Sequence, residues 1–188
     1  MNHPLIVGIS GASGALYGVR LLEVLRRNKI PAHLVISKSA GQTLNEEIGM
    51  SVEQVRALAD ETYSNSDLGA AISSGSFKTR GMVIIPCSIR TLSDIAYGTT
   101  DSLLARAADV VLKERRRLVL VVRESPLHHG HLRAMLAATE NGAIIMPPVP
   151  AFYHAPKTID DLVDQTVGRC LDLFDIDVGL TKRWRADP

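Results

Sequence analysis

The sequence lacks several features that would assign it to a familiar class of protein. Its two cysteines, Cys87 and Cys170, are too few for a disulfide framework and suit a reducing, cytoplasmic location. No apolar run approaches the roughly 20 residues that span a bilayer. The chain begins with a strand-like run, without the charged-then-apolar pattern of a signal peptide. A net charge of +1 gives no general attraction for nucleic acid or for membranes. No internal repeat or low-complexity linker divides the 188 residues, so we expect a single domain.

Apolar, strand-like runs alternate with segments of helical periodicity. We expect strands at 5–10, 32–36, 82–86, 118–122 and 143–146, and helices at 15–27, 38–48, 52–59, 88–96, 102–114, 130–141 and 159–174. The strands are apolar throughout, which is typical of a parallel sheet covered on both faces. This rhythm predicts an α/β fold, a doubly wound parallel sheet in a Rossmann or flavodoxin-like three-layer sandwich. Residues 60–80 are polar, and there we expect a loop with a short helix around 68–72.

A glycine-rich turn, Gly8-Ile9-Ser10-Gly11-Ala12-Ser13-Gly14, joins the first strand to the first helix. Its spacing is G-x-x-G-x-x-G and not the G-x-G-x-x-G of dinucleotide folds. The second strand ends in Ser37-Lys38, where an NAD-binding fold would place an acid for the ribose. NAD binding is therefore disfavoured. Free N–H groups at the helix start favour a mononucleotide or another phosphate ligand, and a purely structural turn is the alternative.

A second strand-to-helix junction reads Pro86-Cys87-Ser88-Ile89-Arg90-Thr91. Ser88 and Thr91 are three residues apart, so both hydroxyls can face one ligand. Ser88 could instead serve only as a helix N-cap. Cys87 follows a buried strand and is expected to be a core residue and not a nucleophile. Two hydroxyl-bearing turns in one sheet favour a phosphorylated ligand.

Charged residues stand at further positions that could face a ligand. Arg106 and Lys113 are seven apart on one expected helix, hence on one face within about 20°. They could converge on an anion or extend to solvent. Arg123 and Glu124 close the fourth strand at its carboxyl end, the functional edge of such sheets, although they could simply pair with each other. The proline-rich segment 146–154 predicts a rigid loop at another strand end.

Two motifs resemble metal sites but are better explained otherwise. Asp160-Asp161-Leu162-Val163-Asp164 spells the D-D-x-x-D of magnesium-dependent prenyl synthases. It directly follows Thr158, so we expect the acids to cap a helix. The histidines at 128, 129 and 131 have no carboxylate or cysteine at ligand spacing, and we expect no metal there.

Several ordered motifs along nearly the whole chain resemble the flavin prenyltransferase family, the UbiX-like partners of prenyl-FMN-dependent decarboxylases. They are Gly8–Gly14, Val35–Lys38, Pro86–Leu92, Arg106–Arg116, Arg123–Pro126, Met146–His154 and Arg183-Trp184. The resemblance implies an enzyme that joins the dimethylallyl group of dimethylallyl phosphate to N5 and C6 of reduced FMN without a metal. The product, prenylated FMN, would pass to a UbiD-like decarboxylase. Whether that serves ubiquinone synthesis or aromatic-acid breakdown is left open by the sequence.

The resemblance also implies the residues of the site. The implied FMN contacts are Gly11, Ala12, Ser13, Ser37, Ser88, Ile89, Arg90, Thr91 and Arg123. The implied donor contacts are Arg106, Lys113, Glu124, Tyr153 and Arg169, with Trp184 closing the pocket. The whole chain, 1–188, would form one flavin-binding domain whose tail, about 175–188, closes the site. A homo-oligomer, a dodecamer, is implied, with sites at subunit contacts that Tyr153, Arg169 and Trp184 could complete in a neighbour.

The residue types suggest how such a transfer would proceed. Arg106, Lys113 and Arg169 would stabilise the departing phosphate, and Glu124 could protonate it. Ser13, Glu47 or the released phosphate could take up protons. The alternatives are a related FMN-dependent decarboxylase of a peptidyl or pantothenoyl cysteine, a non-catalytic flavin carrier and an NADP-linked reductase. The decarboxylases carry a histidine base on an early helix and a P-x-M-N motif, and neither is evident here.

Overall fold

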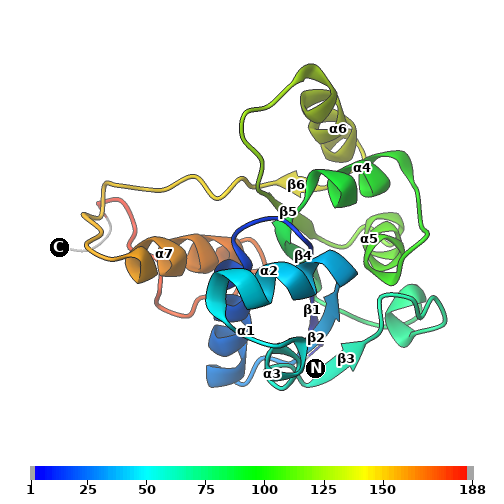
Figure 1. Cartoon of the computed structure of the whole chain (residues 1–188), viewed down its shortest axis with the longest axis horizontal. Coiled ribbons are helices and arrows are strands. Elements are labelled where there is room, and N and C mark those ends of the chain that lie inside the picture. Colours follow the sequence, from blue (N-terminus) through cyan, green and yellow to red (C-terminus); the bar gives the residue numbers. More distant parts are fainter. Residues whose placement is uncertain (1–2, 186–188) are drawn as a thin grey trace.

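Six parallel strands form one sheet that runs through the centre of the molecule (Figure 1). The structure, a computed structural model, describes residues 3–185. The strand order is β3-β2-β1-β4-β5-β6. The strands are β1 (Leu5–Ile9), β2 (Ala32–Ile36), β3 (Glu61–Tyr63), β4 (Gly81–Cys87), β5 (Leu118–Val122) and β6 (Ile144–Ile145). The helices are α1 (Ala15–Arg27), α2 (Lys38–Ile48), α3 (Val52–Arg56), α4 (Ile89–Tyr97), α5 (Leu103–Lys113), α6 (His129–Glu140) and α7 (Ile159–Asp172), with a 3₁₀ turn, η1 (Ala71–Ser73).

Helices cover both faces of the sheet, and each face has its own apolar core. On one face the strands pack against α1, α2, α3 and α7. On the other they pack against η1, α4, α5 and α6. In β5, Val119 and Val121 belong to the first core, whereas Leu118, Leu120 and Val122 belong to the second. Because both sides of each strand are buried, the strands are apolar throughout. The predicted doubly wound three-layer fold is confirmed.

The strand order reverses at the centre of the sheet. β1 pairs with β2 on one side and with β4 on the other, and the register aligns Leu5 with Ala32 and with Gly81. The segments that leave the carboxyl ends of β1 and β4 therefore emerge side by side. Open α/β sheets bind their ligands at such a reversal point.

Most predicted elements are present with small shifts at their ends. The bounds of α1, α2, β2 and β5 agree with the prediction, while α4, α5 and α6 each shift by one residue at one or both ends. The helix expected at 52–59 ends at Arg56. The amide N–H groups of Leu58 and Ala59 bond instead to carbonyls three residues back, which tightens the last turn.

The segment 60–80 was predicted incorrectly in part. It contains the edge strand β3, which pairs with β2, and the turn η1 lies at 71–73 instead of a helix around 68–72. β3 is only three residues long and largely exposed at its start, so it has no apolar pattern to reveal it. At the other edge, the strand expected at 143–146 shortens to Ile144–Ile145.

The two cysteines are buried free thiols in different cores. Burial raises the pKa of both thiols, that of Cys170 to about 12. Cys87, the last residue of β4, is therefore a core residue as predicted. Across residues 3–185, the structure has no helix both long and apolar enough to cross a membrane.

Candidate functional site

A cavity of about 730 Å³ lies at the carboxyl edge of the sheet, beside the reversal point. Segments that follow β1, β2, β3 and β4 line it, together with the start of α5. The lining residues are Gly11, Ser37, Lys38, Ser39, Gln42, Asn65, Ser88, Arg90, Thr91, Asp94, Thr99, Asp101, Ser102 and Leu104. Five of the nine predicted FMN contacts are among them: Gly11, Ser37, Ser88, Arg90 and Thr91.

A buried hydroxyl joins the two central loops. Ser10 is 1% exposed. Its Oγ donates to the carbonyl of Pro86 (2.8 Å) and accepts from the amide N–H of Ser88 (2.7 Å). Ser10 therefore fixes the glycine turn after β1 relative to the helix start after β4. The sequence prediction missed this residue, because its partners are 76 and 78 positions away in the chain.

The backbone at Gly11 passes very close to the start of α2. A Cβ at this position would overlap the side chain of Ser39, lying 2.5 Å from its Cβ. Only glycine allows the two segments to approach in this way. The absence of a side chain at Gly11 thus leaves the wall of the cavity to backbone and serine hydroxyls.

Two helix N-termini point at the same cavity. Ser37 caps α2 by accepting from the amide of Ala40 (3.2 Å). Ser88 caps α4 by accepting from the amide of Thr91 (3.3 Å), and its hydroxyl also donates to the Thr91 hydroxyl (3.1 Å). The predicted capping role and the predicted contact with a ligand are therefore compatible. Two positive helix ends with hydroxyls between them form a suitable site for a phosphate.

The start of α1, in contrast, is already occupied by a carboxylate. Its N-cap, Gly14, has no side chain, and Glu47 of α2 accepts from the amides of Gly14 and Ala15, each at 2.9 Å from Oε2. The prediction of free N–H groups at this helix start is therefore wrong. Because Glu47 already accepts from the amides of Gly14 and Ala15, the starts of α2 and α4 are the better candidates for an anion site.

Glu47 interacts with two other predicted site residues, Ser13 and Arg123. Partial burial disfavours its charged form, but hydrogen bonds from Ser13, Gly14 and Ala15 and the positive charge of Arg123 outweigh this. The pKa of the Glu47 carboxyl is therefore lowered, and Glu47 is ionised at neutral pH. Ser13, Glu47 and Arg123 thus form one polar cluster at the carboxyl edge, beside the glycine turn. Glu124 follows in the chain, is exposed, and accepts from the amide of Ser125 (3.0 Å).

Residues from the poorly patterned segment complete the cavity wall. The side-chain Oδ1 of Asn65 accepts from the amide of Leu104 (3.0 Å), and the backbone carbonyl of Asn65 accepts from the amide of Leu103 (2.8 Å). Asn65 therefore helps to cap α5 in a segment predicted to be a loop. Asp94 of α4 also lines the cavity. Burial raises the pKa of its carboxyl, the positive charge of Arg90 lowers it and the negative charge of Asp101 raises it further. No local pattern identified either residue.

The predicted donor-binding residues do not converge within one chain. On α5, Arg106 pairs with Asp109 (2.8 Å), and Lys113, the last residue of the helix, pairs with the C-cap residue Glu114 (2.6 Å). Lys113 ends α5 just before β5 begins, so it lies at the amino edge of the sheet. Arg169 belongs to α7, which packs on the opposite face of the sheet from α5. The sheet therefore separates the two groups of cations.

Tyr153 and Trp184 lie beside α7. Their rings meet edge to face, with centroids 5.5 Å apart, and Arg169 pairs with Asp172 (2.6 Å). Tyr153 and Trp184 are 47% and 64% exposed, so both aromatic rings have free surface in the single chain. The last three residues of the predicted tail, 186–188, lie outside the described residues.

The aspartate-rich motif has the predicted structural role. Asp161 and Thr158 form a reciprocal capping box at the start of α7. Asp164 accepts from Arg20 on α1, at 2.6 and 2.9 Å. The rings of His128 and His131 lie with centroids 3.6 Å apart and are tilted by 33°. Within residues 3–185 no group of three histidine, cysteine or acidic residues could hold a metal ion.

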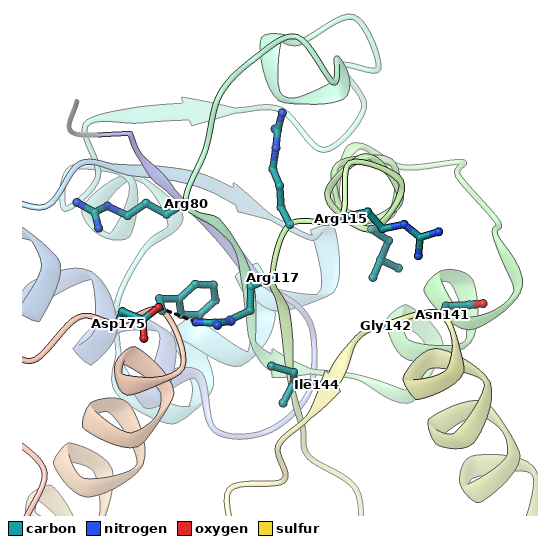
Figure 2. Close-up of a pocket in the computed structure, with 10 residues that line it drawn as sticks. Arg80, Arg115, Arg117, Asn141, Gly142, Ile144 and Asp175 are labelled. Carbon is teal, nitrogen blue, oxygen red and sulfur yellow. Dashed lines mark hydrogen bonds and ion pairs between the residues drawn. The ribbon is translucent and has the colours of Figure 1, made fainter.

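A second cavity, of about 470 Å³, lies at the opposite, amino edge of the sheet (Figure 2). Arg80, Arg115, Arg116 and Arg117 line it, and Arg117 pairs with Asp175 (3.2 Å). Helices α5, α6 and α7 all end at this edge, and cationic side chains compensate the negative ends of helices. Arg117 donates to the carbonyl of Leu173 at the end of α7, and Arg116 donates to the carbonyls of Gly75 and Phe77, so both have partners within the chain.

The fold and the first cavity together define a mononucleotide-binding α/β protein, and a model of the Flavoprotein family matches residues 1–171. The flavin prenyltransferase UbiX of Escherichia coli (strain K12) is 62% identical over 184 residues, covering 96% of this chain and 97% of the relative. The chain belongs to the flavin prenyltransferase family.

Two solved structures are similar over nearly the full chain. The crystal structure of AnUbiX in complex with FMN and dimethylallyl pyrophosphate has a TM-score of 0.97 and 49% identity, covering 100% of both chains. The dodecameric FMN-dependent UbiX-like decarboxylase of Escherichia coli O157:H7 has a TM-score of 0.94 and 49% identity, covering 97% of this chain and 100% of that one. The predicted family and fold are therefore confirmed.

Proposed function

We propose that this protein binds reduced FMN in the cavity at the carboxyl edge and joins to it the dimethylallyl group of dimethylallyl phosphate. Prenylated FMN is the product and passes to a UbiD-like decarboxylase. The observation that carries this proposal is the pair of serine-capped helix starts around one cavity, next to the polar cluster of Ser13, Glu47 and Arg123.

The cavity fits FMN in size and in chemistry. Its volume of about 730 Å³ lies within the roughly 300–1,000 Å³ usual for small-molecule sites. The phosphate is assigned to the starts of α2 and α4, where Ser37, Ser88 and Thr91 supply hydroxyls and the helix ends supply positive potential. Ala12, Ser13 and Ile89 contribute backbone beside them, and Arg123 faces the ring end. When bound, reduced FMN supplies the two ring atoms, N5 and C6, to which the five-carbon unit becomes attached.

The cations of α5 and α7 hold the phosphate of the allyl donor. An allylic phosphate ionises when its departing group is stabilised, and Arg106, Lys113 and Arg169 supply fixed positive charge for that purpose. Tyr153 contributes a hydroxyl, and Glu124, protonated beside the bound phosphate, delivers its proton to the leaving group. A phosphate held by several cationic side chains needs no metal. AnUbiX was crystallised with the pyrophosphate, so both donors belong in any assay.

Proton removal is assigned to Ser13 and Glu47. Because the pKa of Glu47 is lowered, its carboxylate stays ionised and accepts from the Ser13 hydroxyl. A hydroxyl oriented by a carboxylate in this way can take a proton from the reacting atoms and pass its own proton on, and the released phosphate is the final acceptor. Arg123, close enough to act on Glu47, keeps the pair in its charged form.

We assign the separated cations to sites formed between subunits of a homo-oligomer, a dodecamer as in the Escherichia coli O157:H7 relative. Such an assembly allows α5 of one subunit to meet α7 of another. Large apolar side chains that are more than half exposed in the single chain favour burial in contacts of this kind; they are Tyr97, Leu132, Leu136, Val149, Phe152, Ile159 and Trp184. The two free thiols favour a reducing, cytoplasmic location.

Transfer can be tested by the mass of the bound flavin. The protein is incubated anaerobically with reduced FMN and with dimethylallyl phosphate or pyrophosphate, and the flavin is analysed by mass spectrometry. A gain of one five-carbon unit supports transfer, whereas unchanged FMN supports the non-catalytic carrier. Lys113→Ala should reduce turnover while sparing FMN affinity, because Lys113 lies outside the FMN cavity. The cysteine decarboxylase alternative is disfavoured, since neither α1 nor α2 contains the histidine base it needs.

A further inference from the structure

The C-terminal segment 177–185 runs back along α7 and contacts one face of that helix. Three positions of α7 make these contacts: Gln165, Gly168 and Asp172. Their spacing of three, four and seven residues places them on one helix face. Figure 1 shows the loop before α7 (yellow) and the C-terminal segment (red) lying beside the same helix.

Gln165 is a buried amide that connects the loop and the C-terminal segment. It is 4% exposed. Its Oε1 accepts from the amide of Lys182 (3.0 Å), and its Nε2 donates to the Tyr153 hydroxyl (2.9 Å) and to the Lys182 carbonyl (3.3 Å). Only a primary amide offers an acceptor and two donors at one position.

The hydrogen bonds of Gln165 determine what the Tyr153 hydroxyl can do. In this structure the hydroxyl donates to the carbonyl of Lys182 (2.9 Å) and accepts from Gln165. A tyrosine has a single O–H donor. When that donor turns to a phosphate, the Lys182 carbonyl keeps its hydrogen bond from Gln165. Gln165 therefore holds the Tyr153 ring in place and leaves the hydroxyl proton of Tyr153 free to turn toward another acceptor.

Gly168 allows the C-terminal segment to lie directly on the helix. A Cβ at this position would lie 2.6 Å from Oγ1 of Thr181 and 3.1 Å from its backbone N. A side chain here must therefore displace the Thr181 hydroxyl and move the segment outward by a few tenths of an ångström, between its contacts with Gln165 and with Asp172.

Asp172 fixes two arginines on the same face. Its side chain is 13% exposed. Oδ2 accepts from Arg169 (2.6 Å) and Arg183 (3.1 Å), and Oδ1 accepts from Arg183 (3.1 Å). Arg183 precedes Trp184, whose ring meets Tyr153. One carboxylate thus orients a predicted donor-binding arginine and anchors the aromatic residue.

We propose that Gln165 and Asp172 are positioning residues for the allyl donor: together with Gly168 they hold Tyr153, Arg169 and Trp184 in one arrangement. Neither residue needs to touch the donor. This inference rests on the proposed function, in which Tyr153 and Arg169 bind the donor phosphate. It adds that donor affinity depends on how the C-terminal segment is docked on α7.

Steady-state kinetics of the full-length oligomer test the proposal. Gln165→Met and Asp172→Asn should each raise the KM for dimethylallyl phosphate about tenfold, because each removes hydrogen bonds that orient a donor contact. The value of kcat should change far less, and the Kd for FMN should not change. Gln165→Glu should raise the KM for the donor at least as much as Gln165→Met. Its carboxylate would accept a hydrogen bond from the Tyr153 hydroxyl, which then could not donate to the phosphate, and its negative charge would repel the phosphate. The matched control is Gln54→Met, which removes a glutamine that caps α3 away from the site.

Trp184 provides a readout that is independent of activity. It is the only tryptophan of the chain, so intrinsic fluorescence reports the docking of the C-terminal segment. Gly168→Ala should shift the emission to the red and increase acrylamide quenching, and it should raise the KM for the donor in parallel.

The outcomes separate this inference from the proposed function. If the wild type does not prenylate FMN, the proposed function fails. If the wild type is active but the variants keep a normal KM for the donor, the positioning role is refuted. A further outcome would also refute the positioning role. In it, Gln165→Met and Asp172→Asn lose FMN binding and thermal stability, while Gly168→Ala leaves Trp184 emission and the KM for the donor unaltered. These residues would then have a structural role only.

Discussion

Replacing Ser10 by alanine tests how the cavity is held together. The substitution removes one of two hydrogen bonds to the Pro86 carbonyl, which keeps its bond from the amide of Ser10 (3.2 Å). It also removes the bond that Ser10 Oγ accepts from the amide of Ser88 at 2.7 Å. A lost hydrogen bond costs about 1 kcal/mol and an unpaired buried donor about 1–3 kcal/mol, so we expect a loss of about 2–4 kcal/mol.

For a chain of this size, each kcal/mol lowers Tm by roughly 2–4 °C, so the expected shift is roughly 4–16 °C. Thermal unfolding of the apoprotein measures the shift, and FMN titration followed by flavin fluorescence should show weaker binding because Ser88 moves. Ser66→Ala, in an exposed loop, is the control and should leave both unchanged. If Ser10→Ala left Tm within about 1 °C of the wild type and FMN affinity intact, the bridging role of Ser10 would be wrong.

Three further predictions follow from the site. Gly11→Ala should weaken FMN binding at least about tenfold, because the new Cβ overlaps Ser39; equal Kd values in an FMN titration would contradict the close approach. Glu47→Gln should lower Tm at pH 7. The pKa of Glu47 in the folded protein is lowered from 4.5, so its carboxylate stabilises the fold above pH 4.5, and this stabilisation is lost as the pH falls through the folded pKa. The Tm values of the wild type and of Glu47→Gln should therefore converge as the pH falls across this range. A difference in Tm that does not change with pH would exclude the ionised cap. Co-expressed Lys113→Ala and Arg169→Ala chains should regain activity in about one quarter of mixed sites if each site takes these residues from two subunits; rates no higher than those of either variant alone would place both residues in one subunit.

Sequence patterns predicted the elements whose signals are local and strong. α1 and α2 have amphipathic faces, and β2 and β5 are short apolar runs between charged or polar segments, so their ends agree with the structure. The capping role of Asp161 was predictable because Thr158 is only three residues away. β3 was missed because an exposed edge strand of three residues gives neither an alternating nor a continuous apolar pattern.

The candidate site was predictable only in part, because some of its hydrogen bonds join residues that are far apart in the chain. Ser37, Ser88 and Thr91 sit at strand-to-helix junctions, whose position in the sheet follows from the strand order. The bond from Gly14 to Glu47 spans 33 residues and that from Ser10 to Pro86 spans 76. No local pattern encodes such pairs, so the occupied start of α1 was not foreseen. The same holds for Gln165, whose partners Tyr153 and Lys182 come from a loop and a tail without regular structure.

The central claim is that this protein makes a prenylated flavin and does not merely bind FMN. The most direct measurement is the mass of the flavin released after anaerobic incubation of the wild type with reduced FMN and dimethylallyl phosphate, beside Lys113→Ala as the control. We predict a flavin heavier by one five-carbon unit with the wild type and a strongly reduced yield with the variant at unchanged FMN occupancy. Unmodified FMN from the wild type, with either the phosphate or the pyrophosphate donor, would contradict the account.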